Sequence, residues 1–425
     1  MKKILSLGII SVLSLTLLTG CKSTEDSNVV NISILNSKPE IFSQLESVSK
    51  DFMSENKDIN IKLVKYSQTS LYTDKLSSMI YADNAPTLTL VDSAHISIFE
   101  DSCLDLSSEE WINSISGGVP SIAKNDDDQI IAFPFATEGM GFIYNKKVID
   151  EAGIDLAGIN TISSLEEAFK KINAIGKEAL IITNEEWSLG DHFLATMYSV
   201  DSKKSGLDGA EYFQNIKNNS ELLKTDETVN GLIDTFDVMK KYNMYSDSPL
   251  TPSYEKCSEV IGRGEVGFWY MGNWAAQSIL ASSDGNNEFG FIPVPISNNS
   301  SDFGNNEVVM GVTKYFIINK DSSLEQQEAA KKFLNYLVYT ENGNKFIVED
   351  CSIIPAFDNI ETSFNDPLSN DLINYRNNQK SIELMNGYLP IDNSKILGSA
   401  LKKYLNNEIT RENLLQEISD FWGRN

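Results

Sequence analysis

The sequence predicts an α/β protein built as two lobes. Segments with the two-residue alternation of strands recur between segments with the spacing of helices, which predicts largely parallel sheets with crossover helices. The 425-residue chain is too long for one hydrophobic core and suits two domains of ordinary size. Its 41% hydrophobic residues are typical of a folded protein, so long disordered tails are not expected.

The first lobe begins with a β-α-β pattern. Residues 31–35 and 59–64 alternate as strands, and a predicted helix lies between them. The apolar face of that helix is formed by Ile41, Leu45, Val48 and Phe52. A second helix, with Tyr72, Leu76, Met79 and Ile80 on one face, precedes a third predicted strand at 86–92. Ligand crevices of such sheets lie at the carboxyl ends of the strands, where this chain has Asn36, Ser37, Asp92 and Ser93.

A crossing between the lobes is predicted after residue 129. A strand at 129–138 ends on Glu138 and continues into an extended piece bracketed by Gly139 and Gly141. The pair of glycines does not complete a phosphate-binding motif, so we interpret them as small residues that let the chain pass. The preceding acidic run, 125–129, lacks the glycine and the distal glutamate of a calcium loop and is interpreted as a solvated turn.

Helices return in the second lobe. Ser164 and Glu167 suggest a capping box for a helix that buries Leu165, Ala168, Phe169 and Ile172. A strand at 179–183 then ends on two acids and an aromatic residue, Glu185, Glu186 and Trp187. Thr225 begins another helix, with Val229, Leu232, Ile233 and Phe236 on its buried face, and a short helix covers 254–261.

The stretch 264–279 combines a strand, a break and a helix. Residues 265–271 form an aromatic strand, Gly272 and Asn273 break it, and Trp274 begins a helix. Backbone N–H groups at a helix start are unpaired and face the crevice, so Trp274 is expected to form the floor of a cleft. Inside the strand, at least one of Trp269 and Tyr270 is expected to be a core residue. Nothing in the sequence positions of Trp111 and Trp422 suggests that they line a cleft.

The last part returns to the first lobe. Residues 286–306 are rich in Asn, Ser, Gly and Pro and suit a linker. A strand at 308–318 follows, and Ser323 with Gln326 predicts a capping box for a helix that buries Ala330, Phe333, Leu334 and Leu337. Residues 353–355 close this region, and the remainder is helical by pattern.

Charge and residue usage exclude several function classes. The net charge of −25 makes nucleic acid and anionic lipid poor partners. The cysteines other than Cys21 are Cys103, Cys257 and Cys351, an odd number without CxxC spacing, and we expect them to be buried free thiols. With 2 histidines in the chain, a metal site or a Cys–His nucleophile pair has little to draw on, and we expect no cofactor.

The N-terminus has the pattern of a processed leader. Lys2 and Lys3 precede an apolar run at 4–18 that is short for a membrane span, and a small-residue site leads to Cys21. This resembles a bacterial lipobox, which implies removal of residues 1–20 and lipidation of Cys21. Residues 21–30 would then be a polar tether.

Four longer segments point to a family. They are AFPFATEGMGFIYNKKVIDEAGI (132–154), RGEVGFWYMGNWA (263–275), GVTKYFIINKDSSLEQQEAAKKFLNYL (311–337) and SIIPAF (352–357). In this order they resemble an extracellular solute-binding protein of a bacterial ABC importer, in the group containing the maltose-binding protein. The resemblance implies a two-lobed, type II periplasmic-binding-protein-like clamp with the ligand cleft between its lobes. Lobe 1 would comprise 31–137 plus 308–350, and lobe 2 would comprise 138–307 plus 351–425.

The resemblance also implies roles for individual residues. Glu138 would accept hydrogen bonds from sugar hydroxyls and Trp274 would stack on a sugar ring, while Glu185, Glu186 and Trp187 are alternatives for a further acid and aromatic contact. Where maltose-binding relatives carry a Trp-Ala-His-Asp-Arg-like run, residues 91–95 read Val-Asp-Ser-Ala-His, which argues against maltose itself. The candidate ligand-binding residues are Trp274, Glu138, Trp187, Glu186, Asp92, Asn273 and Asn36.

The chemistry favours a neutral mono- or oligosaccharide. Sugar rings present apolar C–H faces to indoles and a rim of hydroxyls to carboxylates and amides. An anionic ligand would favour guanidinium groups, and the arginines of the chain are Arg263, Arg376, Arg411 and Arg424. The expected partners are a carbohydrate, the transmembrane subunits of an ABC permease, and the membrane through Cys21, with the protein itself a monomer and not an enzyme.

Two other functions stay open at this point. A secreted glycoside hydrolase also lines its cleft with acids and aromatics, but it needs two carboxylates on either side of one bond. A binding protein for a polyamine, iron or a peptide is the other alternative, since the 16 tyrosines do not exclude iron chelation.

Overall fold

One mixed sheet runs through both lobes of the molecule. The computed structural model describes residues 29–66 and 71–424. The strands are ordered β2-β1-β3-β8-β4-β6-β5, with β7 paired to β4 and β9 paired to β8. We call the part built on β1–β3 the first lobe and the part built on β5–β7 the second lobe. The predicted two-lobed α/β fold is confirmed.

The first lobe is a β-α-β unit extended by a further helix and strand. Its elements are β1 (Val30–Leu35), α1 (Phe42–Glu55), β2 (Ile59–Val64), α2 (Tyr72–Tyr81), β3 (Leu88–Asp92) and α3 (Ile96–Phe99). β1 pairs in parallel with both β2 and β3, as the crossover pattern predicts. Helix α1 buries Leu45, Val48 and Phe52 against one face of the sheet, while α2 and α3 bury Leu76 and Phe99 on the other.

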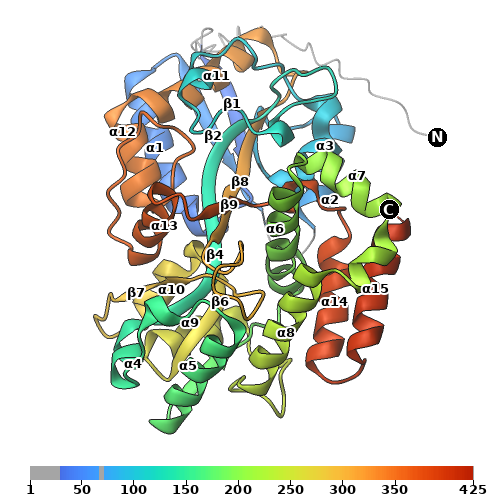
Figure 1. Ribbon diagram of the computed structural model, residues 1–425. Helices are drawn as coiled ribbons and strands as arrows, with labels where there is room; N and C mark the ends of the chain where they lie inside the picture. The colour runs from blue at the N-terminus through green and yellow to red at the C-terminus, as the bar shows by residue number, and fades with distance from the viewer. Residues whose placement is uncertain (1–28, 67–70, 425) are drawn as a thin grey trace, which may run out of the picture.

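Two long antiparallel strands join the lobes. β4 (Phe133–Asn145) pairs with β8 (Val308–Ile318) along its first part, and with β6 (Val266–Gly272) and β7 (Phe289–Ile292) along its second. Figure 1 shows β4 running from one lobe into the other. The predicted crossing at Gly139 and Gly141 is confirmed. A Cβ on Gly141 would lie 2.7 Å from the carbonyl oxygen of Ile292, so only glycine fits here without a backbone shift.

The second lobe surrounds its strands with helices. Its elements are α4 (Lys146–Glu151), α5 (Ile162–Ala174), β5 (Glu178–Ile181), α6 (Ala195–Ser205), α7 (Gly209–Asn218), α8 (Glu227–Lys241), α9 (Tyr254–Gly262), β6, α10 (Ala276–Ala281) and β7. Along β6, Trp269 and Met271 belong to one core cluster while Phe268 and Tyr270 belong to another. Because helices cover both faces of the strand, Trp269 and Tyr270 are both core residues.

Two local predictions in this lobe are wrong. The N-cap of α5 is Thr161, whose hydroxyl accepts from the backbone N–H of Ser164, and Ser164 is its capping-box partner rather than the cap. The stretch 286–306 is not only a linker, because its four apolar residues at 289–292 form β7 on the edge of β4. Asn, Ser and Pro residues flank this short strand, so the composition of the whole stretch does not indicate a strand.

The C-terminal part alternates between the lobes. Helices α11 (Leu324–Tyr339) and α12 (Glu341–Lys345) pack beside α1, with the capping box of Ser323 and Gln326 in place as predicted. They are followed by α13 (Pro367–Asn377), β9 (Ser381–Glu383), α14 (Asn393–Leu405) and α15 (Arg411–Arg424). Strand β9 pairs in parallel with β8 and was not foreseen. Helices α14 and α15 lie beside each other on the second lobe (Figure 1).

Short helical turns fill the connections. The 3-10 turns are η1 (Pro39–Ile41), η2 (Ser93–His95), η3 (Glu100–Ser102), η4 (Glu110–Ser114), η5 (Ser121–Ala123), η6 (Leu156–Gly158), η8 (Ser220–Lys224), η9 (Asn273–Ala275) and η11 (Asn386–Tyr388). Two π-helical turns, η7 (Ser188–Phe193) and η10 (Phe346–Asp350), complete the set. Trp274 therefore lies on a 3-10 turn that leads into α10, one turn before the α-helix proper.

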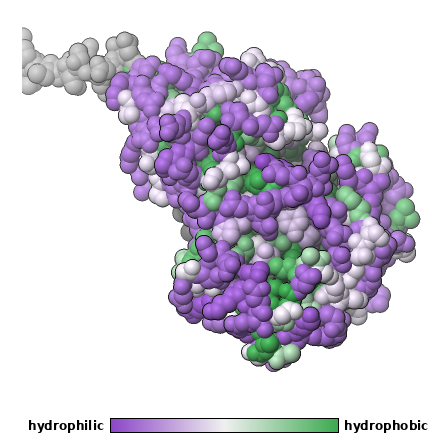
Figure 2. Space-filling model, turned by 60° about the vertical axis from the view of Figure 1, so that its left-hand side comes forward, coloured by the Kyte–Doolittle hydropathy of each residue, from purple (hydrophilic) through white to green (hydrophobic). Residues whose placement is uncertain are grey.

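Core and surface agree with the composition. Trp111 and Trp422 are fully buried, and Cys103, Cys257 and Cys351 are buried free thiols, as expected. The face shown in Figure 2 is mostly hydrophilic, in keeping with the acidic composition. Within the described ranges, every helix is too short or too polar to cross a membrane.

Candidate functional site

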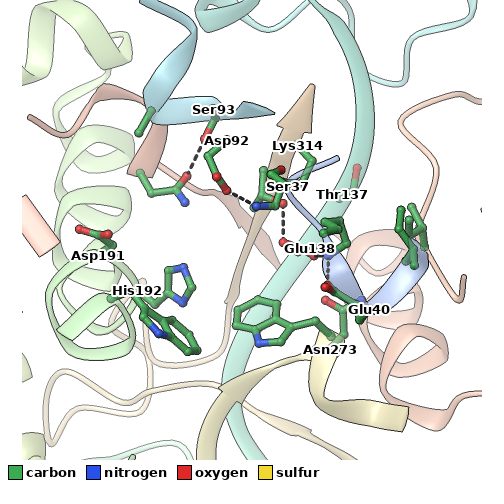
Figure 3. A pocket seen from close by; sticks show the side chains of 18 of the residues that line it. Ser37, Glu40, Asp92, Ser93, Thr137, Glu138, Asp191, His192, Asn273 and Lys314 are labelled. Atoms are coloured by element: carbon green, nitrogen blue, oxygen red, sulfur yellow. Dashed lines mark hydrogen bonds and ion pairs between the residues drawn. The ribbon is translucent and has the colours of Figure 1, made fainter. Parts of the chain in front are cut away.

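A cavity of about 690 Å³ opens between the two lobes. The first lobe contributes the loops that follow β1 and β3, the joining strands contribute residues of β4 and β8, and the second lobe contributes η7, α9 and the turn after β6 (Figure 3). The volume lies in the range of pockets that enclose small-molecule ligands. The carboxyl ends of β1 and β3 thus meet the second lobe at this place, as the fold class predicts.

A buried ion pair forms the base of the first-lobe wall. Nζ of Lys38 lies 2.7 Å from Oε1 of Glu138 and 2.8 Å from a carboxylate oxygen of Glu40. The other oxygen of Glu138 accepts a hydrogen bond from the hydroxyl of Thr313. Lys38 and Glu138 are 5% and 8% exposed, so this pair is almost removed from water.

Both members of this pair are charged. Burial by itself would raise the pKa of Glu138, but the charges of Lys38 and Lys314 and the hydrogen bonds to Glu138 outweigh it and hold the pKa below its ordinary value. Burial would likewise lower the pKa of Lys38, and the carboxylates of Glu138 and Glu40 raise it instead. A carboxylate can accept about four hydrogen bonds, so Glu138 keeps acceptor capacity beyond Lys38 and Thr313.

A second ion pair extends the row. Lys314, on β8, pairs with Asp92 at the end of β3. Nδ1 of His95 lies 3.6 Å from the other oxygen of Asp92. Burial would raise the pKa of Asp92, but Lys314 and then His95 lower it further than burial raises it. Figure 3 shows Asp92, Lys314 and Glu138 along one side of the cavity.

Aromatic side chains form the opposite wall. Trp187, His192, Tyr254 and Trp274 are all half-buried and line the cavity, and we call them the aromatic cluster. The ring centroids of His192 and Trp274 are 5.1 Å apart, and those of Trp187 and Trp274 are 6.2 Å apart. The ring centroids of Tyr254 and Trp187 are 6.4 Å apart. The sequence assigned Trp187 and Trp274 to one cleft, and the structure brings them together there.

The indole of Trp274 lies directly on the backbone of Gly272. A Cβ built on Gly272 would be 2.0 Å from Cζ3 of that indole. The strand therefore has to end in a glycine for the ring to occupy this position. Glycine is needed because it has no side chain to separate the indole from the backbone.

Replacing Gly272 with alanine should displace the indole. We expect Gly272→Ala to cost about 1–3 kcal/mol of unfolding free energy through overpacking and to weaken ligand binding about tenfold. Gly158→Ala is the control, because Gly158 is exposed and its added Cβ would meet its nearest neighbour at 3.9 Å. Urea denaturation and ligand titration of both variants check this. Unchanged affinity in Gly272→Ala would show that the indole position does not matter for binding.

Asn273 lines the cavity but is already engaged. Its side-chain oxygen accepts from the backbone N–H of Gly139 at 3.1 Å, and its amide nitrogen donates to the hydroxyl of Ser369 at 3.1 Å. Asn273 thereby ties the turn that carries Trp274 to β4 and to α13.

Two candidate residues, Glu186 and Asn36, are not among the residues that line the cavity. Glu186 accepts from the hydroxyl of Ser399 at 2.9 Å and lies 3.5 Å from Lys402, so its carboxylate faces α14. Asn36 is buried and binds the backbone of Lys38 through both ends of its amide. It shapes the loop that presents Lys38. Cys21, the predicted lipidation site, lies outside the described residues.

Several lining residues were missed from the sequence. Lys38, Lys314, Asp191, His192 and Tyr254 line the cavity. A signal existed for Lys314, which is a charged residue within the mostly apolar strand 308–318, and for Lys38, which follows a strand end. Asp191 and His192 are carried by the π-helical turn η7, which sequence periodicity does not reveal.

Asp191, on the second-lobe wall, is an unusually weak acid for an aspartate. Burial raises its pKa to about 6, in spite of hydrogen bonds from Asn393 and Ser394 that act in the opposite direction. Nδ2 of Asn393 donates to Oδ1 of Asp191 at 2.7 Å. Figure 3 places Asp191 and His192 across the cavity from Glu138 and Lys314.

The raised pKa of Asp191 gives a pH-dependent stability prediction. The folded state binds this proton more tightly than the unfolded state, so the group costs stability above about pH 6, and that cost disappears as the pH falls toward 4. We expect Asp191→Asn to raise the unfolding free energy at pH 7.5 by about 1–3 kcal/mol, and the gain to vanish near pH 4. Denaturant titrations at both pH values measure it. Asp247→Asn, at an exposed acid, is the control, and an equal gain at both pH values in Asp191→Asn would contradict the assignment.

The described residues hold no group of side chains suited to a metal ion. Across residues 29–66 and 71–424, no three or more His, Cys, Asp or Glu side chains are grouped so that they could hold a metal ion.

A cavity between two α/β lobes, joined by strands that cross from one to the other, is the arrangement of a clamp-type binding protein. Residues 47–373 match the family described as bacterial extracellular solute-binding protein. This match covers more than half of the chain, and the chain belongs to that family. The resemblance seen in the sequence is thereby confirmed.

Individual relatives are distant in sequence and similar in fold. The melibiose/raffinose/stachyose-binding protein MelE of Bacillus subtilis (strain 168) is 22% identical over 372 residues, which cover 82% of this chain and 80% of MelE. The solute-binding protein RafE in complex with raffinose superposes with a TM-score of 0.75 at 18% identity, over 93% of this chain and 99% of RafE. A sugar transporter protein from Bacillus licheniformis in complex with stachyose gives 0.68 at 17% identity, over 93% and 100%.

Proposed function

We propose that this chain is the solute-binding component of an ABC importer and that it binds a neutral mono- or oligosaccharide between its lobes. One observation carries the proposal. The aromatic cluster on the second lobe faces a row of hydrogen-bonding side chains on the first lobe and the joining strands, across one cavity. Indoles cover apolar sugar faces, and fixed polar groups receive the hydroxyls.

The ion pairs favour a ligand without net charge. Glu138 is neutralised by Lys38, and Asp92 by Lys314. A polyamine would need several free carboxylates, and an anionic solute would need free cations. The four paired side chains balance one another, and Asp191, whose pKa is raised to about 6, is a further acid on the opposite wall. Charged hydrogen-bonding groups that are paired in this way still donate to and accept from neutral hydroxyls.

We expect the two lobes to close on the ligand, because the cavity has contact residues on both of them. A ligand that contacts both Trp274 and the row around Glu138 binds more strongly when the lobes are together, so its binding energy favours the closed state. The relatives support an oligosaccharide as the ligand, since MelE is a melibiose/raffinose/stachyose-binding protein and the two similar structures hold raffinose and stachyose. We propose the lobe boundaries 31–137 plus 308–350 and 138–307 plus 351–425.

The proposed partners are a permease and a membrane. The closed form would be delivered to the transmembrane subunits of an ABC permease, and the monomeric protein would be held at the outer face of the cell membrane by a lipid on Cys21. Mass spectrometry of the protein isolated from membranes tests the anchor. An acylated N-terminal peptide beginning at Cys21 is expected, and its replacement by an unprocessed leader would refute the anchor.

The alternative function is that of a glycoside hydrolase, which would cleave the sugar instead of only binding it. Asp191 is an acid with a raised pKa that shares the cavity with ionised Glu138 and Asp92. We propose binding without hydrolysis, because the family relatives are binding proteins. Chromatography of raffinose and stachyose after prolonged incubation with the protein should show no released monosaccharide.

Intrinsic fluorescence tests the ligand class. Trp187 and Trp274 line the cavity, whereas Trp111, Trp269 and Trp422 are fully buried, so a ligand-induced change reports on the cleft. We expect a saturable change with at least one neutral saccharide from a panel that includes melibiose, raffinose and stachyose. A response confined to spermidine, peptides or ferric chelates would refute the sugar assignment.

A further inference from the structure

Two residues that line the cavity from opposite lobes each carry a buried polar atom without a hydrogen-bond partner in the described part of the chain. Oγ of Ser37, on the first lobe, and Nδ1 of His192, on the second, are both buried and have no hydrogen-bond partner among the described residues. Both residues line the cavity. Leaving such an atom unpaired costs about 1–3 kcal/mol, so a pair of them on opposite walls indicates groups that a ligand completes.

The surroundings of His192 fix its ring at the cavity wall. The imidazole packs against Trp187 at 5.2 Å and against Trp274 at 5.1 Å, measured between ring centroids. The residue is carried by the π-helical turn η7, a rare backbone form that is frequent at functional sites. The turn itself contacts α14, which holds it in place.

His192 is uncharged at neutral pH. Burial lowers its pKa to about 4, and Lys314 acts in the same direction, while Glu138 and Asp92 oppose them. Asp191 is its neighbour in the chain and lines the same cavity. A neutral imidazole has one donor and one acceptor nitrogen, which suits a hydroxyl group, since a hydroxyl can both donate and accept.

We propose that His192 and Ser37 are ligand-binding residues that receive hydroxyl groups of one saccharide from opposite lobes. The sugar ring that covers the aromatic cluster would place a hydroxyl on the imidazole, and the same ligand would reach the hydroxyl of Ser37 across the cavity. The pair thereby selects saccharides by the position of these hydroxyls. This inference rests on the proposed function and adds residues that the family match does not assign.

Two variants of His192 separate hydrogen bonding from packing. His192→Phe keeps an aromatic ring against the indoles but removes both nitrogens, and His192→Asn keeps a polar group near the position of Nδ1. With the tightest-binding saccharide of the panel, calorimetry should show about tenfold weaker binding for His192→Phe and a smaller loss for His192→Asn. Ser37→Ala should weaken binding about fivefold. Near-ultraviolet circular dichroism checks that each variant is folded.

Deoxy analogues of the ligand provide the decisive comparison. At least one monodeoxy analogue should bind the wild type about tenfold more weakly than the parent sugar, yet bind His192→Phe as well as the parent does. A purely structural role of His192 would weaken parent and analogue alike, and that result would overturn the inference. If the wild type bound no neutral saccharide, the proposed function would fail first, so the two failures are distinguishable.

Discussion

Replacing Trp274 with alanine should reduce affinity for the bound saccharide by about two orders of magnitude while leaving the fold intact. Covering about 100 Å² of indole at about 25 cal/mol per Å² contributes about 2.5 kcal/mol, which is close to a hundredfold in Kd. Trp274 is half-buried at the cavity wall, unlike the core tryptophans, so its removal should affect unfolding much less than binding. Calorimetric titration and a thermal melt measure both quantities.

The matched control for this variant is Trp274→Phe. Phenylalanine retains an aromatic face over Gly272 and should lose about tenfold or less in affinity. If Trp274→Ala bound as tightly as the wild type, Trp274 would have to be assigned to packing, and the aromatic cluster would no longer explain recognition. If the variant failed to fold, Trp274→Phe would still distinguish the two roles.

The second large effect concerns stability and follows from the buried ion pair. Lys38→Met should lower the unfolding free energy by about 3 kcal/mol, because Glu138 would stay buried without its main counter-charge. Thr313 would still donate to Glu138, but a hydroxyl does not replace an ammonium. Denaturant unfolding at pH 7 measures the loss.

A double variant controls for side-chain size. Lys38→Met combined with Glu138→Gln removes both charges, and we expect it to recover most of the stability that Lys38→Met loses. If Lys38→Met were as stable as the wild type, the pair would contribute nothing and the contact would be incidental.

The same pair determines a pH dependence with a defined sign. The pKa of Glu138 is lower in the folded state, so its contribution is present above the unfolded pKa of about 4.3 and is lost as the pH falls through the folded value. The pKa of Lys38 is raised, so its contribution is present below about 10.4 and is lost only at higher pH. Asp191 acts oppositely on the acid side, since its cost disappears there.

Much of the fold could be predicted from periodicity. The β-α-β unit, the crossing at Gly139 and Gly141, and the capping box at Ser323 follow from local patterns that tertiary contacts reinforce. β7 and β9 were missed because four and three residues are too few to show alternation. The cap of α5 was misplaced because Thr161 and Ser164 are both competent N-caps, and in the structure the helix begins after Thr161.

The candidate site could be predicted only in part. Trp187, Trp274, Glu138 and Asp92 lie at strand ends or at the crossing, and strand ends converge in this fold class. Their ion-pair partners could not be foreseen, since Lys38 and Glu138 are 100 residues apart and Lys314 and Asp92 are 222 apart. Glu186 stands beside Trp187 in the chain but faces α14, because successive residues on a helical turn point in different directions.

Isothermal titration calorimetry of the purified protein with neutral oligosaccharides tests the central claim most directly. The account predicts binding of one saccharide molecule per chain, with a Kd that Trp274→Ala weakens and that moderate salt leaves unchanged, because the ligand is uncharged. Heat of binding for spermidine or a peptide, together with none for any neutral saccharide, would contradict it.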